Sequence, residues 1–297
     1  MATPTNSPLP LLPKRPVDAH KNDFGTALLV GGSRGMAGAV GLAGMAALRG
    51  GAGLVRLAVP DRVLETVAGF EPSYMTVPLA DDDAGRISVQ AYDQILAAAE
   101  PASVVAVGPG MGRSRQLDKL VGLLYCKLDK PMVFDADALN ALATQPDLLA
   151  RPGGPRILTP HPGEFTRLTA EKFTAEKLDD DARRSAAVEM AGRGGIVVVL
   201  KGRHTLITDG TRRATNTTGN PGMATGGSGD VLTGLIAAMV CQGLAPFESA
   251  QVAAHLHGLA GDHAAAELGE VPMIAADLLQ FFPEAFAEYN GGDSAPQ

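Results

Sequence analysis

Short apolar runs alternate with amphipathic or small-residue segments along most of the chain. Most of these runs have the length of a buried strand, and most are followed by a glycine or a polar residue. The predicted strands are residues 26–32, 54–59, 74–79, 103–107, 132–134, 156–158 and 196–200. The predicted helices are residues 36–49, a segment from 61, 89–99, 116–127, 137–143, 163–168 and 180–193. This alternation predicts an α/β fold with a mostly parallel sheet and helices on both faces.

The alternation of predicted strands and helices ends after the strand that finishes near residue 200. Residues 204–209 and 212–216 predict a hairpin around an Asp-Gly turn. The rest of the chain predicts helices at residues 229–242, 246–268 and 275–287. We expect one three-layer domain over residues 16–290, between a Pro-rich tail at 1–15 and a C-terminal tail at 291–297.

Composition narrows the function classes. The 297 residues are 45% hydrophobic and 19% charged, with a net charge of -7 and no cluster of Lys or Arg. Without a basic cluster, the sequence does not predict binding to nucleic acid or to an anionic membrane, so small molecules are the expected partners. Two cysteines are too few for a disulfide framework or a zinc site, and the N-terminus lacks the apolar stretch of a signal peptide. We expect a cytoplasmic protein.

A Gly-rich turn precedes an apolar helix between Gly219 and Gly234, with Asp230 at the junction. Glycines let the backbone approach a bound group, and free N–H groups at a helix start favour an anion. The positive end of the helix dipole is expected to keep Asp230 ionised. A weak, always ionised base suits proton removal from a hydroxyl during phosphoryl transfer. Simple helix capping is the alternative for this turn.

Other polar residues fall where predicted strands end, so they are expected to share one crevice. Lys201 ends an apolar strand, with Gly202 and Thr205 close behind, and His161 lies between two prolines. Asp135 is a candidate for holding Mg²⁺ through water. A solvated lysine, a structural histidine and a helix cap are the alternatives for these three positions. Four further histidines lack metal-ligand company and are expected to be structural or exposed: His204, His255, His257 and His263.

Known phosphate fingerprints are absent, because no lysine follows a glycine at Walker spacing. One competing motif, Gly31-Gly32-Ser33-Arg34-Gly35, fits the nucleophile turn of an α/β-hydrolase, with Ser33 as the nucleophile. This motif follows the first strand, however, whereas the oxyanion hole of such an enzyme needs a loop from an earlier strand. The hydrolase therefore remains a minor alternative.

Ordered motifs across nearly the whole chain resemble the ADP/ATP-dependent NAD(P)H-hydrate dehydratase family, whose fold is similar to ribokinase-like kinases. They include GTALLVGGSRGMAGA, VVAVGPGMG, DADALNAL, ILTPHPGE, VVVLKGRHT, GNPGMATGGSGDVLTG and HGLAGD. The chain departs from the family at Asn22, where His-Lys-Gly is usual. Two other hypotheses are a related kinase for a small alcohol, such as a vitamin precursor, and a catalytically silent nucleotide-binding module. DADALN and TPHPGE match the dehydratases better than the kinases.

The resemblance implies a repair reaction in which 6S-NADHX or NADPHX is dehydrated to NADH or NADPH, with ADP as the usual phosphoryl donor and Mg²⁺ as cofactor. Phosphorylation of the C6 hydroxyl and elimination of phosphate would accomplish it. By motif, Asp230 would be the catalytic base beside an anion hole of Gly227, Ser228 and Gly229. The implied hydrate contacts are Ala39, Gly112, His161 and Asp230. The implied nucleotide contacts are Lys201, Gly202, Arg203, His204, Thr205 and Gly229. The family also suggests a homotetramer.

Overall fold

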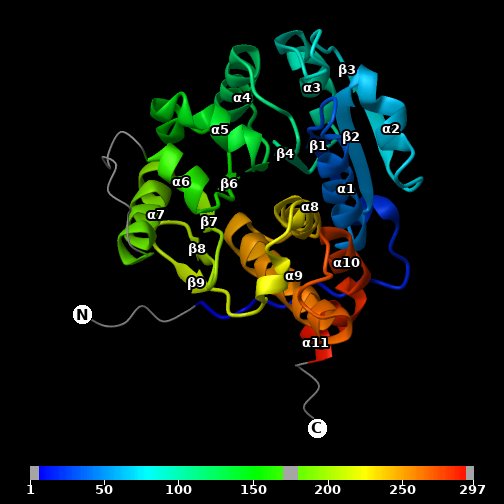
Figure 1. The fold of residues 1–297 in the computed structure, drawn as a ribbon, viewed down its shortest axis with the longest axis vertical. Helices are drawn as coiled ribbons and strands as arrows, with labels where there is room; N and C mark the ends of the chain where they lie inside the picture. The colour runs from blue at the N-terminus through cyan, green and yellow to red at the C-terminus, as the bar shows by residue number, and fades with distance from the viewer. Residues whose placement is uncertain (1–6, 170–179, 292–297) are drawn as a thin grey trace.

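A nine-stranded sheet runs through the computed structural model, which describes residues 7–169 and 180–291 (Figure 1). The strands are β1 (Thr26–Val30), β2 (Leu54–Pro60), β3 (Met75–Leu79), β4 (Val104–Val107), β5 (Met132–Phe134), β6 (Arg156–Leu158), β7 (Val197–Leu200), β8 (Leu206–Thr208) and β9 (Arg213–Thr215). Their order is β3-β2-β1-β4-β5-β6-β7-β8-β9. All pairs from β3 to β7 are parallel, whereas β8 and β9 pair antiparallel. The predicted mostly parallel sheet and terminal hairpin are confirmed.

The helices connect these strands and follow them at the C-terminal end of the described chain. The α-helices are α1 (Ala37–Arg49), α2 (Leu64–Ala68), α3 (Tyr92–Ala99), α4 (Arg115–Lys127), α5 (Asp137–Ala143), α6 (Pro162–Leu168), α7 (Asp180–Gly194), α8 (Ser228–Cys241), α9 (Pro246–Leu268), α10 (Ala275–Gln280) and α11 (Phe282–Gly291). Short 3-10 turns are η1 (Lys21–Phe24), η2 (Asp61–Val63), η3 (Val89–Ala91), η4 (Pro146–Ala150) and η5 (Pro221–Met223).

Two hydrophobic clusters lie on opposite faces of the sheet, so the three-layer prediction is confirmed. In β1, Ala27 and Leu29 face one cluster and Leu28 and Val30 face the other, as the strand period of two requires. Helices α1, α8, α9, α10 and α11 supply the first cluster, and α3 to α7 supply the second. Burial on both faces explains why the strands are continuous apolar runs.

Helix α8 lies in the interior, with every residue from Val231 to Cys241 buried. It packs against α1 through small residues. A Cβ placed on Gly234 would lie 1.9 Å from the carbonyl oxygen of Ala43, so the two helices are too close for any side chain there. This packing fixes the N-terminal turn of α8 relative to the sheet.

Some predicted boundaries are wrong. The segment predicted as one helix at 275–287 consists of α10 and α11, which are separated at Phe281. The segment from Asp61 begins as a 3-10 turn before α2. Part of the N-terminal segment expected as a tail contacts the domain, because the Ser7 N–H donates to the Arg213 carbonyl at 3.0 Å. Residues 1–6 and 292–297 lie outside the described part of the chain. None of the helices in the described ranges is long and apolar enough to cross a membrane.

Candidate active site

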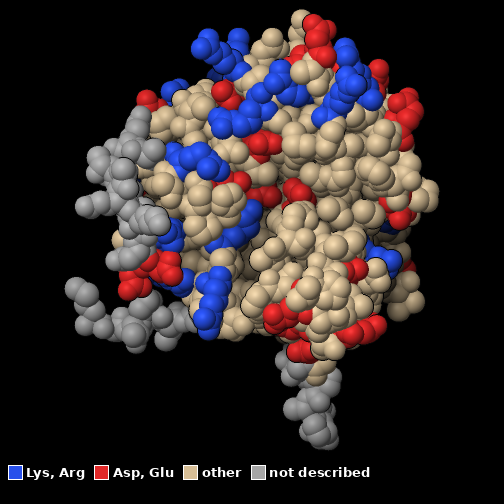
Figure 2. All heavy atoms as spheres, viewed as in Figure 1, with Lys and Arg blue, Asp and Glu red and all other residues tan. Residues whose placement is uncertain are grey.

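The carboxyl ends of β1, β4, β5, β6 and β7 meet at one edge of the sheet because these strands are parallel and adjacent. The order reverses between β1 and β4, and such a switch point is where open α/β sheets bind ligands. Figure 2 shows acidic residues gathered in a hollow at the centre of one face, with Lys and Arg residues along its upper side.

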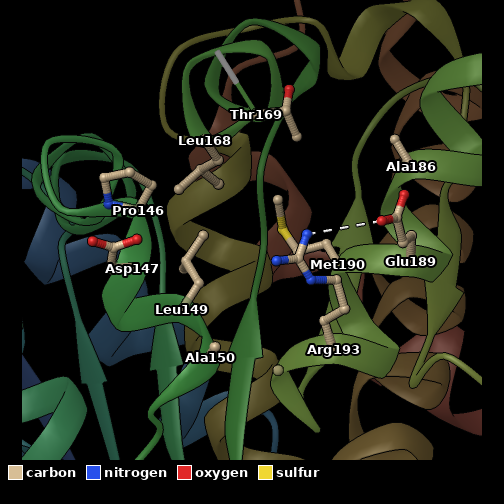
Figure 3. A pocket seen from close by; sticks show the side chains of 11 residues that line it. Pro146, Asp147, Leu149, Ala150, Leu168, Thr169, Ala186, Glu189, Met190 and Arg193 are labelled. Atoms are coloured by element: carbon tan, nitrogen blue, oxygen red, sulfur yellow. Dashed lines mark ion pairs between the residues drawn. The ribbon is translucent and has the colours of Figure 1, made fainter. Parts of the chain in front are cut away.

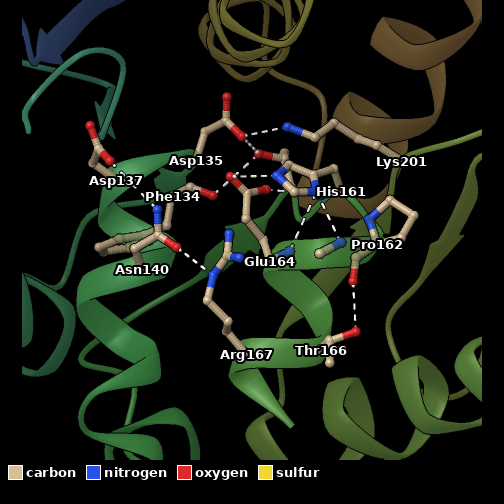
Figure 4. A network of polar contacts seen from close by, with 12 residues as sticks. Phe134, Asp135, Asp137, Asn140, His161, Pro162, Glu164, Thr166, Arg167 and Lys201 are labelled. Atoms are coloured by element: carbon tan, nitrogen blue, oxygen red, sulfur yellow. Dashed lines mark hydrogen bonds and ion pairs between the residues drawn. The ribbon is translucent and has the colours of Figure 1, made fainter. Parts of the chain in front are cut away.

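Asp135, directly after β5, is the hub of a polar network at this edge (Figure 4). Its side chain is 1% exposed. Oδ1 accepts hydrogen bonds from the Thr159 hydroxyl and the Lys201 ammonium, both at 2.7 Å. Oδ2 accepts one from the Thr233 hydroxyl of α8, also at 2.7 Å. Both carboxylate oxygens are therefore engaged by the protein's own donors, which tie α8 to the ends of β5, β6 and β7.

Lys201 is not a solvated surface lysine, since its side chain is only 19% exposed. Burial alone would lower the pKa of Lys201, but the neighbouring carboxylates of Asp135 and Glu164 outweigh burial and raise that pKa. The ammonium lies beside the helix start as well, because a Cβ on Gly229 would be 3.2 Å from Nζ. The structure thus brings Lys201 to the turn that precedes Asp230.

The expectation that Asp230 is always ionised is wrong. Burial, and then the negative charge of Asp135, raise the pKa of Asp230 to about 7, although Lys201 acts in the opposite direction. The helix dipole is too weak to offset the loss of hydration at this half-buried position. A carboxylate with a pKa near neutrality is a better match to general-base work than a carboxylate with the usual pKa.

The turn before α8 has the backbone of an anion site. Gly227 is the N-cap residue with φ 95°, a left-handed conformation that favours glycine. No side chain caps the helix start at Gly227. The Ser228 N–H makes one long hydrogen bond, to the Thr225 carbonyl at 3.4 Å. A helix start without a side-chain cap can still turn its first N–H groups to an anion, and this arrangement supports the predicted anion hole of Gly227, Ser228 and Gly229.

His257 of α9 supports this turn and was expected only to be structural or exposed. Its Nε2 lies 2.9 Å from the Ser228 carbonyl oxygen and 3.3 Å from the Ser228 hydroxyl. Burial lowers the pKa of His257 to about 4, so the ring is neutral and donates its Nε2–H to the carbonyl. No sequence signal linked the HGLAGD motif to the anion-binding turn.

The same face of α9 holds the loop that leads into α8. Asp262 accepts from the Gly219 N–H at 2.8 Å through Oδ2 and from the Asn220 amide at 3.1 Å through Oδ1. A Cβ on Gly261 would lie 2.2 Å from the sulfur of Met223, so the loop packs directly on the helix backbone. HGLAGD therefore fixes the path of the Gly-rich segment from two sides.

His161 is the N-cap residue of α6, in accord with the structural alternative. Its Nδ1 accepts from the Gly163 N–H at 2.9 Å, and its backbone N–H donates to Glu164 Oε2 at 2.9 Å (Figure 4). Its Nε2 lies 3.5 Å from Glu164 Oε1. Burial and the charge of Lys201 lower the pKa of His161, whereas burial raises the pKa of Glu164. The His161 side chain is still 51% exposed, so a ligand can reach its ring.

Ala39 and Gly112 form another wall of the crevice. The Ala39 Cβ is 3.0 Å from a Cβ placed on Gly110, and the Gly112 N–H donates to Asp137 Oδ2 at 2.8 Å. The charge of Asp137 also raises the pKa of Asp230. Between Asp135 and Asp137, Ala136 has φ 49°, an unusual backbone conformation of the kind found at functional sites.

Ser33 does not have the environment of a nucleophile. Its hydroxyl is buried and donates to the Gly110 carbonyl at 2.8 Å, so it ties the loop after β1 to the loop after β4. The hydrolase alternative is therefore excluded.

The predicted nucleotide loop follows Lys201 between β7 and β8. The Thr205 hydroxyl donates to the Gly202 carbonyl at 3.0 Å, which closes the loop on itself. The His204 carbonyl accepts from Arg184 at 3.0 Å. Arg203 is exposed, as a residue that meets a charged ligand can be. The structure places these residues in one turn after β7.

A resident metal does not fit the side chains at this edge. Within residues 7–169 and 180–291, no group of three or more His, Cys, Asp or Glu side chains could hold a metal ion. Both oxygens of Asp135 already accept hydrogen bonds. Mg²⁺ usually binds through substrate phosphates and waters, so any Mg²⁺ would arrive on the nucleotide.

A separate pocket of about 200 Å³ lies between η4, α6 and α7 (Figure 3). Leu149, Leu168 and Met190 provide apolar surface, and Arg193 lies 3.8 Å from Glu189 at its side. None of the predicted site residues lines this pocket, so the crevice at the strand ends remains the candidate active site.

The chain is similar to known proteins over nearly all of its length. A family model described as NAD(P)H-hydrate dehydratase matches residues 27–284. A bifunctional NAD(P)H-hydrate repair enzyme Nnr from Moorella thermoacetica is 46% identical over 274 residues, which cover 92% of this chain and 51% of the relative. The Escherichia coli enzyme of that name is 37% identical over 269 residues, 90% of this chain and 48% of the relative. The chain spans about half the length of these curated relatives.

Solved structures with the same fold add two comparisons. An ADP/ATP-dependent NAD(P)H-hydrate dehydratase from Bacillus subtilis, co-crystallized with ATP and Mg²⁺, is 30% identical with a TM-score of 0.78, over 94% of each chain. A hydroxyethylthiazole kinase from Pyrococcus horikoshii is 14% identical with a TM-score of 0.58, over 89% of each chain, and shows the fold alone. The mostly parallel nine-stranded sheet with helices on both faces defines a ribokinase-like fold. Within that class, the chain belongs to the NAD(P)H-hydrate dehydratase family.

Proposed function

We propose that this chain dehydrates 6S-NADHX and NADPHX to NADH and NADPH with ADP as the phosphoryl donor. The observation that carries the proposal is Asp230, a half-buried carboxylate with a pKa near 7 at the start of a helix that no side chain caps. Family membership and the similarity to the Bacillus subtilis ADP/ATP-dependent NAD(P)H-hydrate dehydratase support the choice of substrate.

The first step is transfer of a phosphoryl group to the C6 hydroxyl of the hydrate. Asp230 removes the hydroxyl proton while the oxygen attacks the terminal phosphorus of ADP, and AMP leaves. The N–H groups of Gly227, Ser228 and Gly229 stabilise the negative charge on the transferred group, in the manner of an anion hole. Most of the catalysis in such a transfer comes from positioning and electrostatics, and both are available at this turn.

The second step is elimination of phosphate. Hydroxide is a poor leaving group, whereas phosphate leaves when the lone pair of the ring nitrogen moves toward C6. Loss of a proton from C5 then restores the ring double bond of NADH. No step in this scheme needs a metal that is held by the protein.

The other site residues bind the two substrates in this proposal. The nucleotide lies along Lys201, Gly202, Arg203, His204 and Thr205 and reaches Gly229. Lys201 supports this role because its ammonium is beside Gly229.

The hydrate contacts Ala39, Gly112, His161 and Asp230. Support comes from the bond between the Gly112 N–H and Asp137, whose charge acts on Asp230, so this wall is coupled to the proposed base. The exposed part of the His161 ring supports its inclusion.

We further propose a homotetramer with a preference for ADP over ATP, in a cytoplasmic location where the nicotinamide cofactors are used. The family resemblance suggests the tetramer, and light scattering after size-exclusion chromatography measures it. Initial rates with each nucleotide at saturating hydrate measure the preference.

Product analysis separates the dehydratase from a small-molecule kinase. We expect one AMP and one phosphate for each NADH formed from NADHX. If ADP is consumed and a phosphorylated compound accumulates without NADH, the chain is a kinase. If purified protein consumes neither ADP nor ATP with either hydrate, the proposal is wrong.

A further inference from the structure

Three arginines come together at one rim of the crevice. Arg34 lies between β1 and α1, Arg86 follows β3, and Arg113 follows Gly112. The Arg34 N–H donates to the Gly85 carbonyl at 3.0 Å, and Arg86 Nη1 donates to the Arg113 carbonyl at 2.7 Å. Three loops that are distant in the sequence are therefore joined.

The three side chains differ in how their charge is compensated. Arg86 forms a two-nitrogen ion pair with Asp82, with Nε and Nη2 each 2.9 Å from Oδ2. Arg34 and Arg113 are both exposed, and neither has an ion-pair partner in the described ranges 7–169 and 180–291. The charge of Arg113 acts on Asp118 without a direct pair. Two uncompensated cations thus lie beside one fixed arginine.

This rim belongs to the wall proposed for the hydrate. A Cβ placed on Gly112 would lie 3.2 Å from Arg86 Cδ and 3.5 Å from Met36 Cε. Met36 is 43% exposed and adds apolar surface between Arg34 and Ala39. A flat ring could lie against this wall while a charged substituent reaches the arginines.

Electrostatics favour an anion at the rim over one at the centre. Asp135, Asp137, Asp230 and Glu164 make the centre acidic, and Lys201 there is already paired with Asp135. Figure 2 shows the same division, with acidic residues in the hollow and basic residues above it. In the proposed reaction the phosphates of ADP occupy the helix start and Lys201, and the acidic side chains repel further phosphates. The hydrate's own phosphates therefore need cations at a distance from the centre.

We propose that Arg34 and Arg113 bind a phosphate of the dinucleotide hydrate, with Arg86 holding their loops in place. This inference rests on the proposed function for the identity of the ligand. The phosphate is either in the pyrophosphate, which both hydrates carry, or the 2′-phosphate, which only NADPHX carries. Arginine suits either one because its planar fork donates two hydrogen bonds to phosphate oxygens.

Equilibrium binding of the products tests the subsite without requiring turnover. NADH and NADPH fluorescence is titrated with wild-type protein, Arg34→Gln, Arg113→Gln and the double variant. We expect the Kd to rise about tenfold for each lost charged hydrogen bond. A higher Kd for both NADH and NADPH locates the pyrophosphate at the rim. A higher Kd for NADPH alone locates the 2′-phosphate there. An unchanged Kd for both ligands in the folded double variant overturns the proposal.

Arg49→Gln is the matched control. Arg49 is exposed in the last turn of α1, about 18 Å along that helix from its first residue, Ala37, and its loss removes the same charge. We expect this variant to bind both ligands as the wild type does. In turnover assays, the rim variants should raise KM for the hydrate and leave KM for ADP unchanged. Wild-type protein that binds NADPH through the rim but forms no NADH would overturn the proposed function and leave the subsite intact.

Discussion

Replacing Asp230 with asparagine should stabilise the protein, by an amount that grows with pH. In the folded protein, burial and Asp135 hold the pKa of Asp230 at about 7, compared with 3.8 for the free side chain. The unfolded chain therefore loses this proton near pH 4, and the folded chain keeps it until about pH 7. Asp230 therefore does not lower the free energy of unfolding below pH 4, where it is protonated in both states. That free energy falls as pH rises from about 4 to about 7, because the unfolded chain is ionised and the folded chain is not.

The two pKa values set the size of the effect. With about 1.4 kcal/mol per pH unit, ionisation of Asp230 destabilises the fold by about 2 kcal/mol at pH 5 and about 4 kcal/mol at pH 8. Asparagine has nearly the same shape and no charge. The advantage of Asp230→Asn should therefore widen by about 2–3 kcal/mol between these pH values.

Urea unfolding followed by circular dichroism at pH 5 and pH 8 measures this difference. Asp83→Asn is the control, because Asp83 is fully exposed and its one ion-pair distance, to Arg62, is 4.0 Å. We expect a small and pH-independent change for the control. An Asp230→Asn advantage that stays constant with pH, or a less stable variant at pH 8, would refute the assigned proton affinity.

Three further changes test other parts of the site. The kcat/KM for the hydrate should fall about tenfold per pH unit below pH 7, because Asp230 becomes protonated there. Asp135→Asn should move the pH at which kcat/KM begins to fall to a lower value, since the charge of Asp135 raises the pKa of Asp230. A pH-independent kcat/KM would contradict this prediction. His257→Leu should lower kcat about tenfold, whereas His257→Gln should keep most of the wild-type kcat because glutamine retains a hydrogen-bond donor. Equal kcat values in the two variants would show that the His257 hydrogen bond does not support the turn before α8. Gly234→Ala should lower the unfolding free energy by about 1–3 kcal/mol in urea titrations, whereas Gly38→Ala, with open space around it, should not.

Much of the site could be predicted from the sequence because its residues directly follow predicted parallel strands. Lys201, His161 and Asp135 follow three different apolar runs, and the parallel sheet brings those ends to one edge. The alternation of apolar strands and helices was enough to predict that sheet. Their convergence with Asp230 followed from topology rather than from any one motif.

Contacts from a distant helix could not be predicted in this way. His257 and Asp262 have no catalytic or metal-ligand spacing, and only packing of α9 on the Gly-rich loop reveals their partners. The pKa of Asp230 was also out of reach, because it depends on burial and on Asp135 from another strand. The local sequence reveals the helix dipole, whereas the loss of hydration depends on the whole fold.

Arg156 shows a different limit. It lies in the short strand β6, where an apolar residue is the usual expectation, and it is 1% exposed. Its guanidinium donates to backbone carbonyls, including those of Tyr125 at 3.0 Å and Lys130 at 2.9 Å. Burial lowers the pKa of Arg156 to about 10. Carbonyls from the end of α4 and the residues after it stabilise this buried cation, together with the Tyr125 ring, whose centroid is 5.5 Å from Cζ.

Formation of NADH tests the central claim most directly. Purified wild-type protein and Asp230→Asn are each mixed with NADHX, ADP and Mg²⁺, and NADH absorbance is followed over time. We predict NADH formation that depends on ADP, and turnover lowered about 100-fold or more in the variant, as expected for loss of a general base. No NADH with either ADP or ATP, or a variant that turns over at nearly the wild-type rate, would contradict the account.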